Sequence, residues 1–321
     1  MRRVLSHFMP EQASNLAPEV DWIFCALLAL CGAVALLMLA LITLFCIRYR
    51  RGSKAARAEQ KGWAGRVTAV SLEFGWTVGP LLIFIALFAW AADVFFKMSK
   101  PPADADEIYV VGKQWMWKIQ HANGRREINE LHIPIGRAVK LIMTSQDVIH
   151  DFFVPAFRTK QDVLPGRYTT QWFTPTRPGK YHLFCSQYCG TDHATMGGWV
   201  YVQNPQEHAR WLAQQAVPAS LIAQGERTFH TLGCSGCHAE NSKIHAPLLD
   251  GIYGKPVPLS DGTFVIADDQ YLRDSILLPN KQIAAGYEPV MPTFQNQISE
   301  EDLAALLAYL KSLGGAERRN Q

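Results

Sequence analysis

Two long uncharged stretches dominate the first hundred residues. Residues 22–47 form a run of 26 without a charged side chain, and residues 74–92 form a second run of 19. Each run is long enough to cross a hydrocarbon core of about 30 Å as an α-helix. The sequence therefore predicts a two-helix transmembrane hairpin within residues 1–99, with spans at about 22–47 and 73–96.

Basic residues between the two runs predict the orientation of this hairpin. One acidic residue, Glu59, stands there against seven basic ones: Arg48, Arg50, Arg51, Lys54, Arg57, Lys61 and Arg66. By the positive-inside rule the connecting loop is cytoplasmic, so both termini face outward. The alternative is a cleaved signal peptide, but the first run is too long for one and its basic cluster follows the run instead of preceding it.

Residues 100–205 change to the two-residue period of β-strands. Val139, Leu141 and Met143 alternate with Lys140, Ile142 and Thr144, and four further runs are strand-like: 108–111, 168–173, 180–185 and 198–202. Turn signals such as Asn123-Gly124 and Pro165-Gly166 separate them. Several short strands at this spacing predict an all-β sandwich or barrel.

Helical patterning returns in residues 218–315. Ser299 to Asp302 is an N-terminal capping signal. Four leucines then follow at helical spacing before Gly314 ends the helix: Leu303, Leu306, Leu307 and Leu310. We expect an all-α domain at 218–315, outside the membrane like the β domain at 100–205. A linker at 206–217 joins the two domains, and a tail follows at 316–321.

Composition narrows the classes of function. Among 321 residues, 18% are charged and 49% hydrophobic, which fits about two soluble domains with a membrane-embedded minority and excludes a disordered chain. The net charge is +3 and no basic stripe occurs, so nucleic-acid binding is not indicated. Three of the seven cysteines lie in the first membrane run, and the others form two tight pairs that indicate two separate sites.

Soft metal ligands gather in residues 185–196. Two thiols, an imidazole and a thioether occur within twelve residues: Cys185, Cys189, His193 and Met196. This set favours copper over calcium or magnesium. Two alternatives stay open on the residues alone. One is a disulfide between Cys185 and Cys189 in an oxidising compartment, and the other is zinc, although zinc rarely recruits a thioether.

The second cysteine pair belongs to a different motif. Cys234-Ser-Gly-Cys237-His238 is C-x-x-C-H, the signature of covalent c-type haem attachment with the histidine as proximal ligand. A redox dithiol or half a zinc site are alternatives, but neither requires the histidine. Met291 lies in a Val-Met-Pro-Thr-Phe segment that resembles the cytochrome c loop carrying the sixth ligand, so this haem would transfer electrons. The alternative is that Met291 fills a core.

The soft-ligand motif at residues 185–196 resembles the copper A loop in subunit II of the haem-copper oxygen reductases. That family also has an upstream histidine before a V-P…K-x-D-x-x-P-G-R stretch, which matches His150 and residues 154–167. The resemblance implies a cupredoxin-like barrel with two coppers. The implied ligands are two bridging thiolates, two terminal imidazoles, a weak thioether and a weak backbone carbonyl: Cys185, Cys189, His150, His193, Met196 and Gln187, respectively.

At three further positions the resemblance suggests a role, but the residue differs from the family pattern or a second interpretation is open. Gln187 stands where most members have glutamate, so copper binding through its carbonyl should survive, but an interfacial magnesium is in doubt. Trp115 resembles the tryptophan at the electron-entry surface, although Met116 replaces the usual tyrosine and a place in the barrel core is the alternative. Glu73 resembles the glutamate at the mouth of a proton channel in subunit I, with an interfacial carboxylate as the alternative.

The C-terminal domain resembles class I cytochromes c beyond its haem motif. Gly225 and Phe229 before the motif, with Tyr309 in the last helix, resemble the crossing helix pair of that family. Pro247 resembles the proline whose carbonyl orients the proximal histidine, although Ala246 replaces the usual glycine. Residues 256–262 read as a loop insertion.

A membrane hairpin, a copper A domain and a cytochrome c domain in this order resemble subunit II of the caa-type cytochrome c oxidases. The resemblance implies that single electrons pass from an external donor, such as a cytochrome c or a bc complex, to haem c, copper A and the haem of subunit I. There oxygen is reduced to water with proton translocation. It also implies contacts with subunit I, subunit III and lipid in the bacterial inner membrane, with both cofactor domains on the periplasmic side. This chain itself contains no oxygen-reducing site.

Three other classes of protein remain as alternatives. A nitrous-oxide reductase also uses copper A but needs a large histidine-rich domain. A copper carrier or assembly protein has no need of a fused haem. A quinol oxidase subunit II lacks the copper ligands that are present here.

The distribution of charge adds a hypothesis about the two exported domains. Residues 101–205 carry eleven basic and nine acidic residues, whereas residues 218–321 carry eight and twelve. We therefore expect the acidic cytochrome domain to dock electrostatically on the basic copper domain. Tethering supplies an effective concentration of about a millimolar, so little intrinsic affinity is needed.

Overall fold

The computed structural model describes residues 9–53, 63–213, 220–239, 242 and 244–314. The chain forms two compact units. Residues 16–100 make up one unit, and Met1–Asn15 together with Pro101–Gln321 make up the other. The second unit contains a β-barrel followed by a helical domain.

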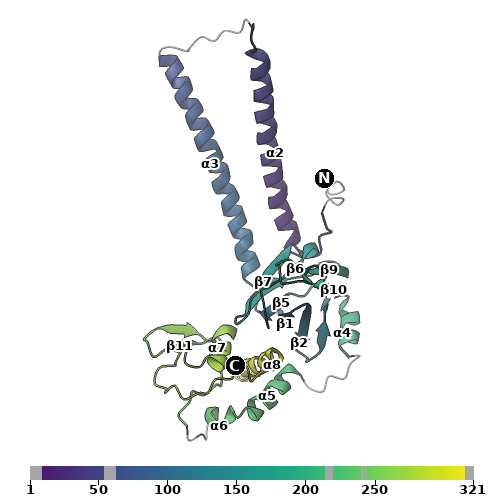
Figure 1. Ribbon diagram of the computed structural model, residues 1–321, viewed down its shortest axis with the longest axis vertical. Coiled ribbons are helices and arrows are strands. Elements are labelled where there is room, and N and C mark those ends of the chain that lie inside the picture. The colour runs from purple at the N-terminus through teal and green to yellow at the C-terminus, as the bar shows by residue number, and fades with distance from the viewer. Residues whose placement is uncertain (1–8, 54–62, 214–219, 240–241, 243, 315–321) are drawn as a thin grey trace. The chain divides into compact units, whose positions relative to one another are not determined.

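Two long helices make up the first unit, α2 (Ala17–Arg48) and α3 (Trp63–Ser99) (Figure 1). In their most apolar stretches, only 0% and 6% of the residues, respectively, are buried within the protein. A core helix of a soluble protein would be mostly buried, so both helices agree with the predicted spans. Lys54, Arg57 and Lys61 of the predicted cytoplasmic loop lie outside the described residues.

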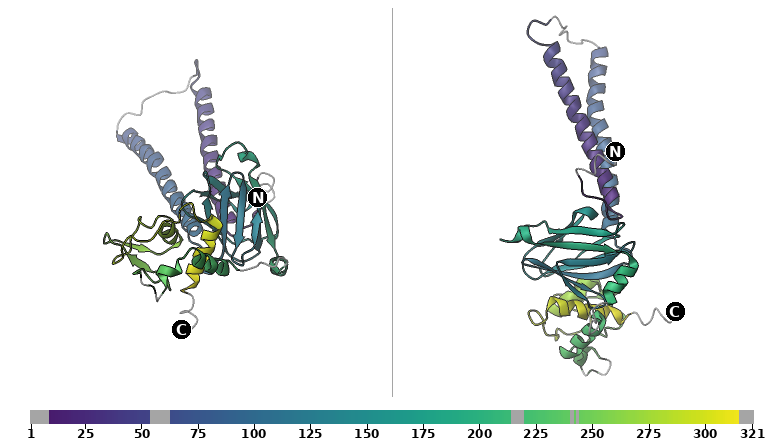
Figure 2. Two further views of the ribbon diagram at one scale, coloured as in Figure 1. Left: turned by 60° about the horizontal axis from the view of Figure 1, so that its bottom comes forward. Right: turned by 90° about the vertical axis from the view of Figure 1, so that its right-hand side faces the viewer.

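Two five-stranded sheets form the barrel domain (Figure 2). The first has the order β3-β2-β1-β5-β8 and the second β4-β10-β9-β6-β7. Their strands are β1 (Asp106–Lys113), β2 (Met116–His121), β3 (Arg126–Ile128), β4 (Glu130–Pro134), β5 (Val139–Ser145), β6 (His150–Val154), β7 (Thr159–Val163), β8 (Thr169–Phe173), β9 (Gly179–Cys185) and β10 (Gly197–Gln203). The β1–β5 and β4–β10 pairs are parallel and the other pairs antiparallel. This is the predicted cupredoxin-like barrel.

Alternating inward side chains fill the barrel. Val139, Leu141 and Met143 of β5 are buried, as their two-residue period predicts. The largest fully buried side chains include Trp117 and Phe152, whose rings meet edge to face at 5.1 Å between centroids. Trp117 therefore belongs to the core, whereas Trp115 is half-buried at the β1–β2 turn.

Two segments outside the sheets complete the barrel domain. Ahead of α2, the backbone of Ala13 exchanges hydrogen bonds with Ala156 and Thr176, both of 2.9 Å. At the other end, residues 205–213 form helix α4 (Pro205–Ala213) where the sequence predicted the start of a linker. The rest of that linker, 214–217, lies outside the described residues.

The helical domain contains α5 (Leu221–Thr231), α6 (Ser235–His238), α7 (Asp269–Leu277) and α8 (Glu300–Ser312). The hydroxyl of Ser299 caps α8 by accepting from the Asp302 amide, as predicted. Gly225 lets α5 cross α8 closely, since a Cβ there would lie 2.0 Å from the Ala305 carbonyl oxygen. The predicted loop insertion instead contains a hairpin of β11 (Pro256–Pro258) and β12 (Phe264–Ile266).

Candidate functional site

The candidate copper ligands come from two adjoining strands and the loop that follows one of them. His150 begins β6 and Cys185 ends β9, and these strands pair antiparallel with Phe152 opposite Cys185. The other side chains lie on the loop between β9 and β10, which carries the short 3-10 helix η2 (His193–Thr195) and ends at Met196. The barrel thus brings together residues that are up to 46 positions apart in the sequence.

Distances show how tightly these side chains converge. The Sγ atoms of Cys185 and Cys189 are 3.8 Å apart. His150 Nδ1 lies 3.9 Å from Cys185 Sγ, and His193 Nδ1 lies 3.4 Å from Cys189 Sγ. The thioether of Met196 and the carbonyl of Gln187 complete the cluster, at 3.8 Å from Cys189 Sγ and 3.3 Å from Cys185 Sγ, respectively.

The two thiols are free, which argues against the disulfide alternative. A disulfide would bring the sulfur atoms to about 2.05 Å. Burial would raise the pKa of Cys185, but hydrogen bonds to groups that include His150 lower it to about 7. Burial and then the charge of Cys185 raise the pKa of Cys189. The Cys185 thiol therefore ionises easily, whereas the Cys189 thiol resists ionisation. A soft cation bound by both sulfur atoms would stabilise two neighbouring thiolates.

Hydrogen bonds outside the cluster fix the orientation of its ligands. Asp147 accepts from His150 Nε2 at 2.8 Å, which leaves Nδ1 directed at the thiols. Trp115 and Gln114 both donate to the Cys189 carbonyl, at 3.2 and 2.9 Å. Gly112 provides room for the imidazole, since a Cβ there would lie 2.9 Å from His150 Cδ2.

Every donor type in this cluster suits copper. Two thiols, two imidazoles and one thioether are soft or borderline ligands, and Cys185, Cys189 and His150 are buried. A thioether at the site is unusual for zinc. Gln187, whose side chain is exposed, offers the cluster its backbone carbonyl only. The residues present therefore fit a copper centre.

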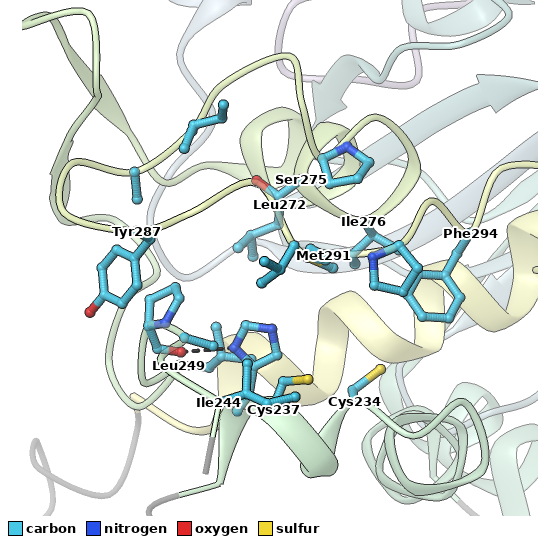
Figure 3. Close-up of a pocket in the computed structure, with 18 of the residues that line it drawn as sticks. Cys234, Cys237, Ile244, Leu249, Leu272, Ser275, Ile276, Tyr287, Met291 and Phe294 are labelled. Carbon is cyan, nitrogen blue, oxygen red and sulfur yellow. Dashed lines mark hydrogen bonds between the residues drawn. The ribbon is translucent and has the colours of Figure 1, made fainter. Parts of the chain in front are cut away.

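The second candidate site is an apolar pocket of about 250 Å³ in the helical domain. Cys234, Cys237, His238 and Met291 all line it. Figure 3 shows the two cysteine sulfur atoms at one side of the pocket, with Met291 and Phe294 across from them. Apolar side chains supply most of the remaining wall, among them Leu272, Ile276, Leu306 and Leu310.

A hydrogen bond orients His238, the residue that the sequence predicts as the proximal ligand. His238 Nδ1 donates to the Pro247 carbonyl at 2.8 Å, the dashed line in Figure 3. That bond leaves Nε2 as the nitrogen free for iron. Cys234 and Cys237 are unpaired thiols, so they are available for thioether bonds. The pocket, its sulfur atoms and its oriented histidine fit a covalently bound haem.

One buried polar cluster was not anticipated. Glu127, on β3, has a side chain only 6% exposed and bonds His121 Nε2 at 2.6 Å and also His132 Nδ1. Burial would raise the pKa of Glu127, but these two hydrogen bonds lower it to about 2. Trp211 of α4 stacks on His132 at 4.4 Å between ring centroids and so attaches the helix to the barrel.

No motif in the sequence marks this cluster. His121 and His132 lie on strands β2 and β4, and both are buried. His208 of α4 adds a third imidazole whose pKa falls to about 4, first through burial and then through the charges of His121 and His132. A carboxylate that points inward between two inward histidines would identify this cluster. That arrangement can be recognised only when the strand pairing is known.

Comparison with known proteins assigns both domains to known families. Residues 126–202 match the family model for the cytochrome c oxidase subunit II periplasmic domain, and residues 222–314 match that for cytochrome c. Cytochrome c oxidase subunit 2 of Thermostichus vulcanus is 31% identical over 282 residues, which cover 70% of this chain and 84% of that protein. This chain belongs to the cytochrome c oxidase subunit 2 family.

A second relative matches more of the chain, and a solved structure matches a shorter part of it. Subunit 2 of Alkalihalophilus pseudofirmus is 28% identical over 315 residues, which span 92% of this chain and 88% of that protein. The crystal structure of the periplasmic domain of subunit II from Bradyrhizobium japonicum shares 30% identity over 36% of this chain and 95% of that domain, with a TM-score of 0.34.

Membership places the protein in haem-copper oxidases, which are oxidoreductases with several subunits. The subunit II domain supports copper A, the cytochrome c domain supports haem c, and their fusion supports a caa-type variant. The apolar helices α2 and α3 support a membrane protein with a periplasmic domain. An electron-transfer role in the oxidase follows from these features together.

Proposed function

We propose that this subunit accepts single electrons from an external donor at haem c and passes them through copper A to the haem of subunit I. There oxygen is reduced to water with proton translocation. The main support is that a single chain contains both sites. Soft ligands meet at a loop of the barrel, and the C-x-x-C-H motif lines a separate pocket in which a hydrogen bond orients the histidine. A copper carrier would have no use for the second site.

Six residues would hold two coppers in the barrel. Cys185, Cys189, His150, His193, Met196 and the Gln187 carbonyl would supply the ligand atoms. The bound pair supplies a one-electron redox site. The chain's own contribution is to hold the ligands before metal arrives, because Asp147 fixes the His150 ring and two donors fix the Cys189 backbone.

The haem would be held by four residues of the helical domain. Cys234 and Cys237 would bind the haem covalently, and His238 and Met291 would bind its iron. Methionine and histidine ligation raises the haem potential and leaves no open iron position, which suits electron transfer. The carbonyl of Pro247 selects which imidazole nitrogen faces the iron.

Two further residues receive provisional roles from the resemblance. Trp115 would be the electron-entry residue of the barrel, and its hydrogen bond to the Cys189 carbonyl connects it to the copper loop. Glu73, in α3, would stand at the mouth of a proton channel with subunit I. Magnesium is not part of the proposal, because the neutral amide of Gln187 is a poor ligand for a hard cation.

The proposed location is the bacterial inner membrane, as a two-span protein with both termini and both cofactor domains outside. Ala13, ahead of α2, bonds the barrel domain that follows α3. The chain before the hairpin and the chain after it therefore belong to one unit, which supports the proposal that both ends of the hairpin emerge on one side. Subunit I, subunit III and lipid are the proposed partners in the membrane.

Rapid mixing of the full-length, metal-loaded chain with a one-electron reductant tests the proposed order. We expect the haem absorbance to change first and the near-infrared band of copper A to bleach afterwards. Cys234→Ala with Cys237→Ala, which removes haem attachment, should slow copper reduction, while Cys46→Ser in α2 is the matched control. Copper reduction at the same rate without haem would contradict the proposal.

A further inference from the structure

Helix α4 packs on the barrel beside β4 and β10 through the ring of Trp211 (Figure 1). The indole stacks on His132 at 4.4 Å between ring centroids, and the Arg125 guanidinium carbon lies 3.5 Å from the indole centroid. The ring of His121 meets the indole edge to face at 5.3 Å. Arg125 also donates to the Trp211 carbonyl. The helix is therefore docked against a cluster of basic side chains.

The same helix brings an imidazole of its own to this cluster. His208 precedes Trp211 by three positions, and the two rings stack at 5.5 Å between centroids. Its Nδ1 lies 3.3 Å from Gln203 Oε1, so the neutral ring can donate a hydrogen bond there. His208 also lines a cavity of about 420 Å³ together with His121 and His132. Three imidazoles thus share one cavity at the junction of helix and barrel.

The acidic groups around His208 already have basic partners. Asp106 and Glu107 of β1 line the cavity, and each forms an ion pair, at 2.6 and 2.9 Å, with Arg137 and Lys140, respectively. Glu127 bonds the two barrel imidazoles. The charged side chains beside His208 on α4 itself are exposed: Glu207 and Arg210. Among the described residues that line the cavity, no unpaired carboxylate is available to receive a positively charged His208.

A second proton on His208 would therefore arrive in a place that disfavours positive charge. Burial, and then the charges of His121 and His132, lower the pKa of His208 to about 4, with Asp106 and Glu127 opposing the shift. An imidazole in water has a pKa of about 6.5. The proton thus binds more tightly to a detached α4 than to a docked one. Docking is at full strength above about pH 6.5 and weakens as the pH falls towards 4.

We propose that His208 and Trp211 make α4 an acid-sensitive latch, in which proton uptake by His208 releases the helix from the barrel. Residues 214–219 connect α4 to α5, so release lengthens the connection between the two exported domains. The nine residues of α4 add up to about 30 Å of chain when extended. A regulatory role for this latch rests on the proposed function, because proton translocation acidifies the outer compartment. The latch itself is a property of this chain alone.

Hydrogen exchange in the full-length chain, with haem and copper bound and in detergent, tests the latch. Mass spectrometry follows the α4 amides at pH 7 and pH 5, after correction for the intrinsic pH dependence of exchange. We expect protection of α4 to fall about tenfold or more at pH 5, because docking weakens by up to tenfold for each pH unit in this window. His208→Gln keeps an amide donor near Gln203 but takes up no proton, so α4 should stay protected at both pH values. Exposed His182→Gln, in β9, is the matched control and should follow the unaltered chain.

Carbon NMR of labelled histidine in the fully reduced chain follows His208 directly, through the signal that is missing from His208→Gln. We expect a titration midpoint well below 6.5, and this midpoint decides the case even where His208→Gln fails to dock. Equal α4 protection at pH 5 and pH 7 in the unaltered chain, or a midpoint near 6.5, would overturn the proposal. So would an undiminished pH dependence in His208→Gln. Because no electron transfer is measured, failure of the latch is distinguishable from failure of the proposed function.

Discussion

The two cofactor sites are built in different ways. At the copper site, polar contacts orient the ligands: Asp147 holds His150, and Trp115 and Gln114 hold the Cys189 carbonyl. At the haem pocket, one hydrogen bond orients His238 and apolar side chains supply the wall. The barrel therefore controls ligand geometry bond by bond, whereas the helical domain controls it through packing.

This difference predicts which changes should damage each site. A packing error between helices should remove the haem as a whole, while loss of one polar contact in the barrel should weaken copper binding in steps.

Gly225→Ala should have the largest effect. A Cβ at this position would lie 2.0 Å from the Ala305 carbonyl oxygen, and a backbone atom of α8 cannot move aside. We expect a loss of about 3 kcal/mol or more in the unfolding free energy of the cytochrome domain, with loss of haem. Gly236→Ala is the matched control, since a Cβ there meets nothing within 4 Å. Normal haem content in Gly225→Ala, read from the optical spectrum, would contradict the packing account.

Glu127→Gln should destabilise the barrel by about 2–3 kcal/mol at neutral pH. The pKa of Glu127 falls from 4.5 to about 2 on folding, so its stabilisation is present above pH 4.5 and is lost as the pH falls through about 2. The variant should therefore lose stability at pH 7 and show a flatter acid limb in chemical denaturation. Exposed Glu130→Gln should behave like the unaltered chain, and equal pH profiles for all three would refute the cluster's role.

Asp147→Asn should weaken copper binding by about tenfold without unfolding the barrel. The amide keeps the shape of the side chain but removes the negative charge beside His150 Nε2. Competition with a copper chelator measures the affinity, and haem content should be unchanged. Asp104→Asn, on the exposed segment before β1, provides the comparison. An unchanged affinity would show that the His150 ring is held by packing.

Ser299→Ala should have the smallest effect, about 1 kcal/mol in the unfolding free energy of the cytochrome domain. It removes the hydroxyl that accepts from the Asp302 amide at the start of α8. Thermal denaturation followed at the haem band should detect the shift, and exposed Ser260→Ala should not reproduce it. A loss of haem at room temperature would mean that the cap does more than stabilise the helix.

The sequence predicted the features whose signals are local. The two spans follow from uncharged runs, the start of α8 from Ser299, and both sulfur-rich motifs from residue spacing. The contact between His238 and the Pro247 carbonyl, which the resemblance to cytochromes c implied, is present at 2.8 Å. Helix α4 escaped prediction because it is short and depends on Trp211 packing against the barrel.

Features that depend on residues far apart in the sequence were missed or were predicted only in part. Glu127 looks like a surface residue until strand pairing turns His121 and His132 toward it. Net charge suggested that the domains would meet, and it matched the sense of the Lys118–Glu301 pair. It could not predict the Lys311–Glu107 pair, because a sum over a domain hides which residues face each other.

Metal analysis combined with electron paramagnetic resonance tests the central claim most directly. The full-length chain would be purified with haem attached, loaded with copper and measured in its oxidised form. The account predicts two coppers per haem iron and one unpaired electron shared equally between the two coppers. One localised copper per chain, or a silent copper signal with haem present, would contradict the assignment of a paired centre to Cys185 and Cys189.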